Sequence, residues 1–100
     1  MHGQGKKTYK ESGKIFEGEW KDGEFIQGTC TWNKGKRKGD VYEGSYVQGR
    51  RQGHGKYTWA NGDIYVGNWV NSKRSGQGKK TYKESGKVEE GEWKDDKFIG

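Results

Sequence analysis

The chain of 100 residues has no leucine, a single cysteine and few aliphatic side chains of any kind. Hydrophobic residues make up only 26% of it, which excludes a large conventional core. No apolar run approaches the roughly 20 residues of a membrane-spanning helix. We therefore expect no such helix and no signal peptide. The expected location is cytoplasmic or at a membrane surface. Cys30 has no second cysteine to pair with, so an intramolecular disulfide framework is excluded as well.

Glycine and aromatic residues are abundant instead. The sequence contains 19 glycines, and 14% of its residues are aromatic, five of them tryptophan. A chain this polar, with a net charge of +6, would by composition alone be classed as disordered. The aromatic residues argue against disorder, because their rings can supply the buried surface that aliphatic side chains do not.

An internal repeat dominates the sequence. Residues 3–14 recur unchanged at 76–87, and an aromatic follows a glycine by four residues at Gly5/Tyr9, Gly28/Trp32, Gly55/Trp59 and Gly78/Tyr82. These glycines are separated by 23, 27 and 23 residues. We therefore predict that residues 1–100 form one array of four units. The units span approximately residues 3–27, 28–54, 55–77 and 78–100.

Each unit is predicted to form a β-hairpin. In the third unit a short strand, Lys56–Trp59, leads into a turn at Ala60–Asp63, and a second strand follows at Ile64–Trp69. The turn contains Asn-Gly, a strong hairpin signal because both residues tolerate positive φ. One repeat cannot cover its own rings, but stacked neighbours can. We predict an all-β fold, in which tandem antiparallel hairpins stack into one elongated, twisted meander sheet of about eight strands.

One face of this sheet is expected to carry glycines alternating with aromatic rings. Side chains alternate between the two faces of a strand, so Tyr65, Gly67 and Trp69 share a face. We expect a ring from a neighbouring strand to lie over Gly67. The residues expected to build the repeat core are Phe16, Gly18, Trp20, Trp32, Tyr42, Gly44, Tyr46, Trp59, Tyr65, Gly67, Trp69, Gly91 and Trp93.

The pattern Tyr-x-Gly-x-aromatic-x-x-Gly-x-x-x-Gly-x-Gly, complete from Tyr42 to Gly55, resembles the MORN repeat (membrane occupation and recognition nexus). The copy that begins at Tyr65 has Ser72 in place of one glycine, and the last copy has Glu89 in place of the aromatic. The resemblance implies a β-hairpin array of the kind found in scaffold proteins, in plant phosphatidylinositol-phosphate kinases and beside lysine methyltransferase domains. It also implies lipid binding in some members of the family.

Catalytic and metal-binding patterns are missing from the sequence. His54 fills the variable position between Gly53 and Gly55, and Cys30 has no histidine in its own repeat. We expect Cys30 to be a packed, inert thiol on the aromatic face. Neither clustered histidine and cysteine nor a carboxylate loop is present to bind a metal. We therefore expect no enzymatic activity, no cofactor and no metal.

Positive charge is concentrated in the two middle units. Residues 28–54 hold six Lys/Arg against two acids, and residues 55–77 hold three against one, which accounts for the net +6. Positions in each unit are counted from the residue that opens the Tyr-x-Gly-x-aromatic pattern, which we call the aromatic slot (Phe16, Tyr42, Tyr65 and, in the last copy, Glu89). The eighth and ninth residues after this slot are basic in the two middle units. In the outer units they are Glu24, Phe25, Lys97 and Phe98. The candidate anion- or partner-binding residues are a ladder of Arg50, Arg51, Lys73 and Arg74, and a turn on the opposite edge with Lys34, Lys36, Arg37 and Lys38. The alternative is ordinary surface charge that protects the sheet edges.

The leading functional hypothesis is a non-enzymatic repeat scaffold that binds protein partners along the aromatic-glycine sheet. One alternative is peripheral binding to anionic, phosphoinositide-type membranes through the basic loops. Another is a regulatory accessory domain of a larger enzyme. Self-association through the end repeats also stays open. Nucleic acid is not expected as a partner, because the glycine pattern commits the aromatic residues to packing.

Overall fold

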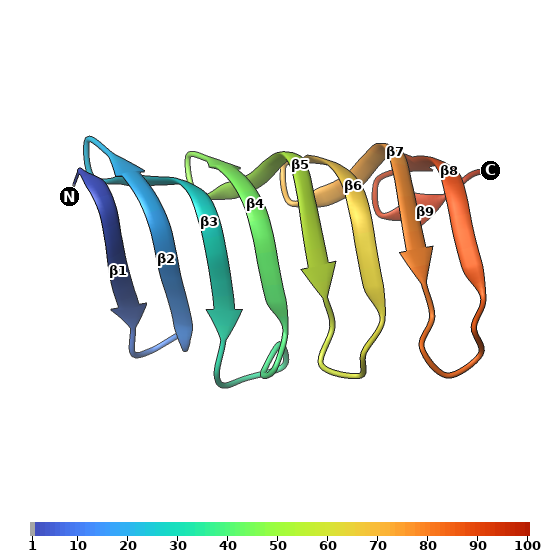
Figure 1. The fold of residues 1–100 in the computed structure, drawn as a ribbon, viewed down its shortest axis with the longest axis horizontal. Helices are drawn as coiled ribbons and strands as arrows, with labels where there is room; N and C mark the ends of the chain where they lie inside the picture. Colours follow the sequence, from blue (N-terminus) through green and yellow to red (C-terminus); the bar gives the residue numbers. More distant parts are fainter. Residues whose placement is uncertain (1) are drawn as a thin grey trace.

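A computed structural model describes residues 2–100, so that Met1, the first residue of the predicted array, lies outside it. The described residues form nine strands in a single sheet, in the order β1 to β9, with every neighbouring pair antiparallel (Figure 1). The strands are β1 (Gly3–Tyr9), β2 (Lys14–Lys21), β3 (Glu24–Trp32), β4 (Val41–Val47), β5 (Arg50–Thr58), β6 (Ile64–Val70), β7 (Lys73–Thr81), β8 (Val88–Lys94) and β9 (Lys97–Phe98). The predicted fold class is confirmed. None of these residues is helical, and none could form a membrane-spanning helix.

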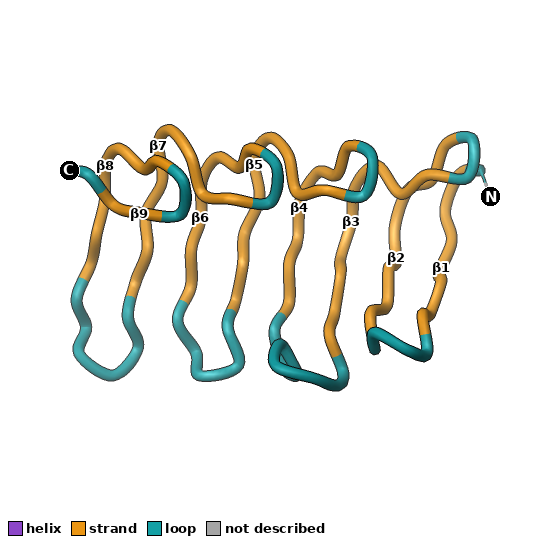
Figure 2. Tube along the Cα trace, turned by 180° about the vertical axis from the view of Figure 1, so that it is seen from behind, coloured by secondary structure: helices purple, strands orange, loops and turns teal. Residues whose placement is uncertain are grey.

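The sheet is elongated across its strands. It measures 40 × 24 × 18 Å, and the two ends of the chain lie at its opposite ends (Figure 1). The turns within the four hairpins lie along one side, and short turns that join one hairpin to the next lie along the other. Seen from behind, the short turns fold over one face of the sheet (Figure 2). This face is therefore concave.

The short turns have a backbone conformation typical of tight two-residue hairpins. Both residues have positive φ in each of them, as in Gln48 (50°) and Gly49 (76°). The turn predicted at Asn61–Gly62 does close a hairpin, but only Gly62 has positive φ (98°). Its geometry thus differs from the type that the Asn-Gly pair suggested.

Bulges bend the strands just before the short turns. The pairing register shifts between Gly44 and Tyr46 on β4, and between Gly67 and Trp69 on β6. A bulge bends its strand and increases the local twist. The strands continue through the bend, so β5 begins at Arg50, six residues before the predicted start at Lys56.

The core lies between the sheet and the turns that fold over it. Its rings pack mostly edge to face, which is a favoured arrangement of aromatic pairs. Tyr42, for example, lies 5.6 Å from Trp69 at 89° and 5.3 Å from Tyr46 at 85° (centroid distances). The buried cluster comprises Phe16, Trp20, Phe25, Cys30, Trp32, Tyr42, Tyr46, Tyr57, Tyr65, Trp69 and Trp93, with Trp59 and Phe98 packed against it. The residues predicted to build the repeat core did not include Phe25, Tyr57 and Phe98, whereas Cys30 is packed on the aromatic face as expected.

Neighbouring strands approach closely where two glycines face each other. A Cβ atom added to Gly67 would lie 2.5 Å from the Cα of Gly78 and 2.6 Å from the carbonyl oxygen of Gln77. The neighbouring backbone therefore closes the space at Gly67, together with the hydroxyl of Tyr65 from the same strand. The prediction that a ring from a neighbouring strand lies there was wrong. Such a ring is found one strand along, where Tyr65 lies over Gly78.

Polar atoms of the buried rings bond to the backbone, the indoles at repeat glycines and two tyrosine hydroxyls at the bulges. Trp69 Nε1 donates to the carbonyl of Gly55 (3.3 Å), and the Tyr42 hydroxyl donates to the carbonyl of Ser45 at the bulge (3.0 Å). The indole bond recurs between Trp20 and Gly5 and between Trp93 and Gly78, and the hydroxyl bond recurs between Tyr65 and Asn68. The repeated glycine and aromatic positions therefore hold the bend as well as the core.

Candidate functional site

The ninth position after the aromatic slot points into the core in the units that carry arginine as well as in those that carry phenylalanine. Phe25 is 7% exposed and Arg51 is 8% exposed, while Arg74 and Phe98 are half-buried. Arg51 and Arg74 thus occupy the place that phenylalanine takes in the outer units.

The predicted ladder of Arg50, Arg51, Lys73 and Arg74 is therefore not a single exposed row. Arg50 and Lys73 are exposed, whereas Arg51 and Arg74 turn inward, because consecutive residues of a strand point to opposite faces. The phenylalanines at the equivalent positions of the outer units are the signal that could have revealed this from the sequence.

Arg51 lies in an aromatic cage. Its Cζ atom is 5.0 Å from the ring centroid of Trp69 and 5.3 Å from that of Tyr57, with Trp32 and Tyr42 also within 6 Å. Cation–π attraction favours this placement. Among the described residues no carboxylate pairs with Arg51. Its Nη2 donates to a backbone carbonyl, and its Nε is buried without a partner.

Arg74 has similar aromatic contacts and an acidic partner. Its Cζ atom lies 5.1 Å from the ring of Trp93 and 5.3 Å from that of Trp59. Nε donates to Asp96 Oδ1 (3.2 Å), and Nη2 donates to the Asp96 carbonyl (3.0 Å). The charge of Arg74 is thereby partly neutralised, while that of Arg51 is not.

The short turns of the following repeats are matched to these arginines. Ser72 (φ 65°) and Asp96 (φ 70°) adopt a left-handed conformation that costs a non-glycine residue about 1–3 kcal/mol, and Gly49 has the same place in the turn that precedes Arg51. The side chains of Ser72 and Asp96 accept the backbone N–H of Arg51 (3.1 Å) and Arg74 (2.8 Å). The backbone carbonyls of the two turn residues accept from the guanidinium groups. These bonds account for serine where the repeat pattern has glycine.

A third arginine reaches the same region from the long turn of the second unit. Arg37 Nη1 donates to the Tyr57 hydroxyl (2.9 Å), and that hydroxyl donates to Asp40 Oδ2 (2.6 Å). Burial, assisted by the hydrogen bond to Asp40, raises the pKa of Tyr57 to about 12. Asp40 is itself buried and accepts the N–H of Ala60 (2.8 Å), which anchors the long turn.

We call the space between these three side chains the arginine pocket. It has a volume of about 160 Å³. Its lining residues are Arg37, Arg51, Tyr57, Trp59, Trp69, Ser72, Arg74 and Asp96. Of the second predicted basic group, Arg37 therefore belongs to the pocket, whereas Lys34, Lys36 and Lys38 are exposed on the turn.

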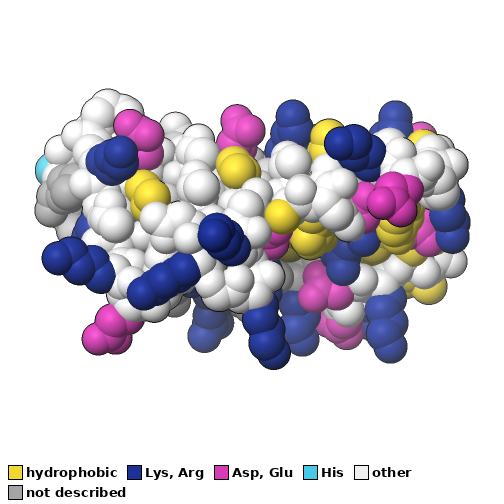
Figure 3. Space-filling view, turned by 90° about the horizontal axis from the view of Figure 1, so that it is seen from below, with side chains coloured by type: hydrophobic (Ala, Val, Ile, Leu, Met, Phe, Trp, Pro, Cys, Tyr) yellow, Lys and Arg dark blue, Asp and Glu magenta, His cyan; other side chains and the backbone are white. Residues whose placement is uncertain are grey.

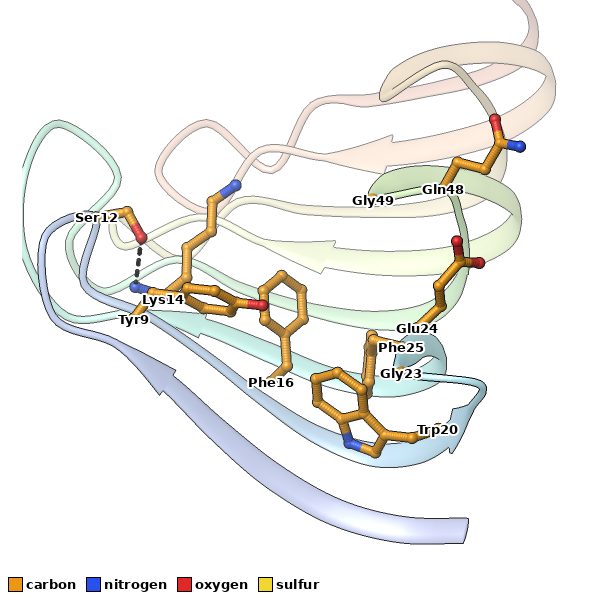
Figure 4. A pocket seen from close by; sticks show the side chains of 10 residues that line it. All are labelled: Tyr9, Ser12, Lys14, Phe16, Trp20, Gly23, Glu24, Phe25, Gln48 and Gly49. Carbon is orange, nitrogen blue, oxygen red and sulfur yellow. Dashed lines mark hydrogen bonds between the residues drawn. The ribbon is translucent and has the colours of Figure 1, made fainter. Parts of the chain in front are cut away.

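A larger and more apolar pocket lies toward the N-terminal end of the concave face (Figure 4). We call it the aromatic pocket, and its volume is about 490 Å³. Phe16, Trp20 and Phe25 form its floor, and the short turn at Gln48–Gly49 borders it. The remaining lining residues are Tyr9, Ser12, Lys14, Gly23 and Glu24.

The surface formed by the turns within the four hairpins carries charges of both signs. Lysine and arginine side chains are spread over this view, with acidic side chains among them (Figure 3). This mixed distribution contrasts with the arginine pocket, where three cations face one carboxylate.

Cys30 and His54 lie apart from any grouping of reactive side chains that the sequence suggested. Cys30 is fully buried, and burial raises the pKa of its thiol, which disfavours the reactive thiolate. His54 is exposed between two glycines. Within residues 2–100, no three His, Cys, Asp or Glu side chains are grouped so as to hold a metal ion.

An open meander of repeated hairpins, in which the recurring residues form the core, defines a repeat module. A family model for the MORN repeat matches residues 1–14, 16–25, 42–64, 65–87 and 90–98. These segments cover most of the chain, which therefore belongs to the MORN-repeat family. Its two longest matches start at Tyr42 and Tyr65, which are buried aromatic residues of β4 and β6. A search among curated proteins gave no match.

Proposed function

We propose that the chain is a non-enzymatic interaction module that binds a segment of a partner protein along its concave aromatic face. The observation that carries this proposal is the presence of two different pockets on that face, one aromatic and one lined by three arginines. Aromatic residues and arginine are the side chains most enriched at the energetic centres of protein interfaces. MORN repeats are generally modules for interaction or membrane binding, which agrees with this role.

A photoreactive amino acid placed on either face tests the proposal. Gln48 borders the aromatic pocket and is exposed, whereas Val66 is exposed on the opposite face and serves as the matched control. Irradiation in the organism that encodes the protein should crosslink a defined partner peptide from position 48 and not from position 66. Equal crosslinking from both positions, or none from either, would contradict binding at the concave face.

Binding to anionic membranes is the second candidate, and the exposed basic turn favours it. Lys34, Lys36 and Lys38 project together from one long turn, and each basic residue near an anionic surface contributes about 1 kcal/mol. Vesicles containing phosphatidylserine should then sediment with the protein at low salt. Binding should weaken near physiological ionic strength, where the Debye length is about 8 Å. Glutamine at these three positions should abolish it, and no sedimentation at low salt would refute this candidate.

A further inference from the structure

The arginine pocket has an excess of positive charge on its walls. Three arginines and one aspartate line it, which leaves a formal charge of +2. Asp40 lies behind Tyr57, outside the lining, and is occupied by the tyrosine hydroxyl and by a backbone N–H. A buried cation without an acidic partner is costly, and Arg51 is such a cation.

We propose that this pocket binds a phosphate group carried on a side chain of the partner protein, an inference that rests on the proposed function. A phosphorylated side chain carries a charge of about −1.5 to −2 near neutral pH, which complements the charge of the pocket. Arginine is suited to this role because its planar guanidinium donates two parallel hydrogen bonds to phosphate oxygens.

Donor groups are available for such a ligand. Arg37 uses Nη1 for Tyr57, Arg51 uses Nη2 for a carbonyl, and Arg74 uses Nε and Nη2 for Asp96. Each guanidinium therefore keeps one Nη group that makes no hydrogen bond to the described residues. The three arginines that carry these groups come from the turn between β3 and β4, from β5 and from β7, and all three line the same space.

The size and depth of the pocket indicate the source of the phosphate. At about 160 Å³ it is smaller than the roughly 300–1,000 Å³ of small-molecule sites, so it suits a single group and not a whole ligand. Arg51 is 8% exposed, and the side chain of Arg74 is 16% exposed. A planar bilayer meets the exposed lysines before it meets these recessed arginines, whereas a phosphorylated side chain can enter between the turns.

The decisive variant is Arg51→Phe. Phenylalanine stands at the equivalent position as Phe25 and Phe98, so this change removes the charge with a residue that the fold already accepts there. Arg37→Gln is the second variant, because Arg37 lies on an exposed turn and outside the buried cluster, so that its replacement removes no core side chain. Arg50→Gln and Lys73→Gln are the matched controls. Each removes one positive charge next to an inward arginine, from a side chain that is itself exposed.

The probes are inorganic phosphate and free phosphotyrosine, each added to the protein while chloride is reduced to keep the ionic strength constant. The indole N–H resonances of Trp59 and Trp69, which line the pocket, should shift and saturate in the natural sequence. Each lost charge-assisted bond should weaken binding at least about tenfold in Arg51→Phe and Arg37→Gln. Binding by Arg50→Gln and Lys73→Gln should stay within about twofold of the natural sequence, because screening leaves exposed charges with little effect.

Three results would overturn the proposal. The first is no saturable shift in the natural sequence, and the second is an equal loss in the pocket variants and the controls. The third is that phosphotyrosine does not bind, while phosphatidylcholine vesicles displace inorganic phosphate only when they contain phosphatidic acid. That result would assign the phosphate to a lipid. Crosslinking from position 48 is measured separately. A partner peptide captured there without phosphate binding would refute this inference and leave the proposed function standing.

Discussion

Replacing Gly55 by alanine tests whether the repeat glycines are required for space. Tyr42 from β4 lies over Gly55 on β5, and an added Cβ would lie 2.6 Å from Tyr42 Cε1 and closer still to its Cζ and hydroxyl oxygen. Gly55 is not among the glycines with positive φ, so backbone strain does not contribute. Tyr42 is fully buried and cannot move aside without disturbing Tyr46 and Trp69.

The expected cost follows from three terms. Overpacking of a filled core costs about 1–3 kcal/mol, and loss of the hydrogen bond from Tyr42 to Ser45 costs about 1 kcal/mol. Alanine offsets about 0.4–1 kcal/mol of this loss, because it lowers the conformational entropy of the unfolded chain relative to glycine. The net loss is therefore about 1–3.5 kcal/mol. For a chain of this size each kcal/mol lowers Tm by about 4–8 °C.

Thermal and urea unfolding, followed by tryptophan fluorescence, measure the effect. A double-mutant cycle with Tyr42→Phe isolates the contact, because removing the hydroxyl relieves the nearest clash. Phenylalanine already occupies this slot in the first unit, as Phe16. An alanine variant as stable as the natural protein, or a cycle with no coupling, would refute the account of close packing at glycine.

Three further predictions concern titration, reactivity and local stability. Burial raises the pKa of Tyr42 and Tyr57 from 10 to about 12, so the unfolded chain loses these protons at lower pH than the folded protein. The free energy of unfolding should therefore be unchanged below pH 10 and fall between pH 10 and 12. Tyrosinate absorbance and thermal melts at alkaline pH would show this, and ionisation of all tyrosines near pH 10 without unfolding would contradict it. Cys30 should resist a thiol reagent until the protein unfolds, since its thiol is fully buried, and rapid labelling of the native protein would be the contrary result. Hydrogen exchange should be slowest within residues 41–69, because repeat arrays open from their ends, and uniform protection would argue against this.

The sequence predicts the fold class and the period because both depend on local patterns. The alternation of Tyr65, Gly67 and Trp69 determines which face is buried, and the recurrence of this pattern determines the stacking. All three residues are indeed buried in the structure. The fold over the concave face was not predictable in the same way. It depends on bulges at positions such as Ser45, which shift the pairing register and bend the strand although the aromatic residues on both sides stay buried.

The error at Arg51 and Arg74 has a different cause. Their charge suggested exposure, but a long cationic side chain can lie over aromatic rings and hydrogen-bond a nearby carbonyl. Comparison of equivalent positions carries more information than residue type here. Phe25 and Phe98 stand at the same place in the outer units, so the position faces the core whichever residue occupies it.

The direction of the hydrogen bonds relative to the chain ends has a mechanical consequence. Because the strands lie across the long axis, the bonds between neighbouring strands run along it (Figure 1). A force applied to the two ends therefore peels one strand at a time and never shears several strands together. Each repeat of 23 residues that yields would release up to about 80 Å of chain. Under tension the array would lengthen in steps at low force, as an extensible tether.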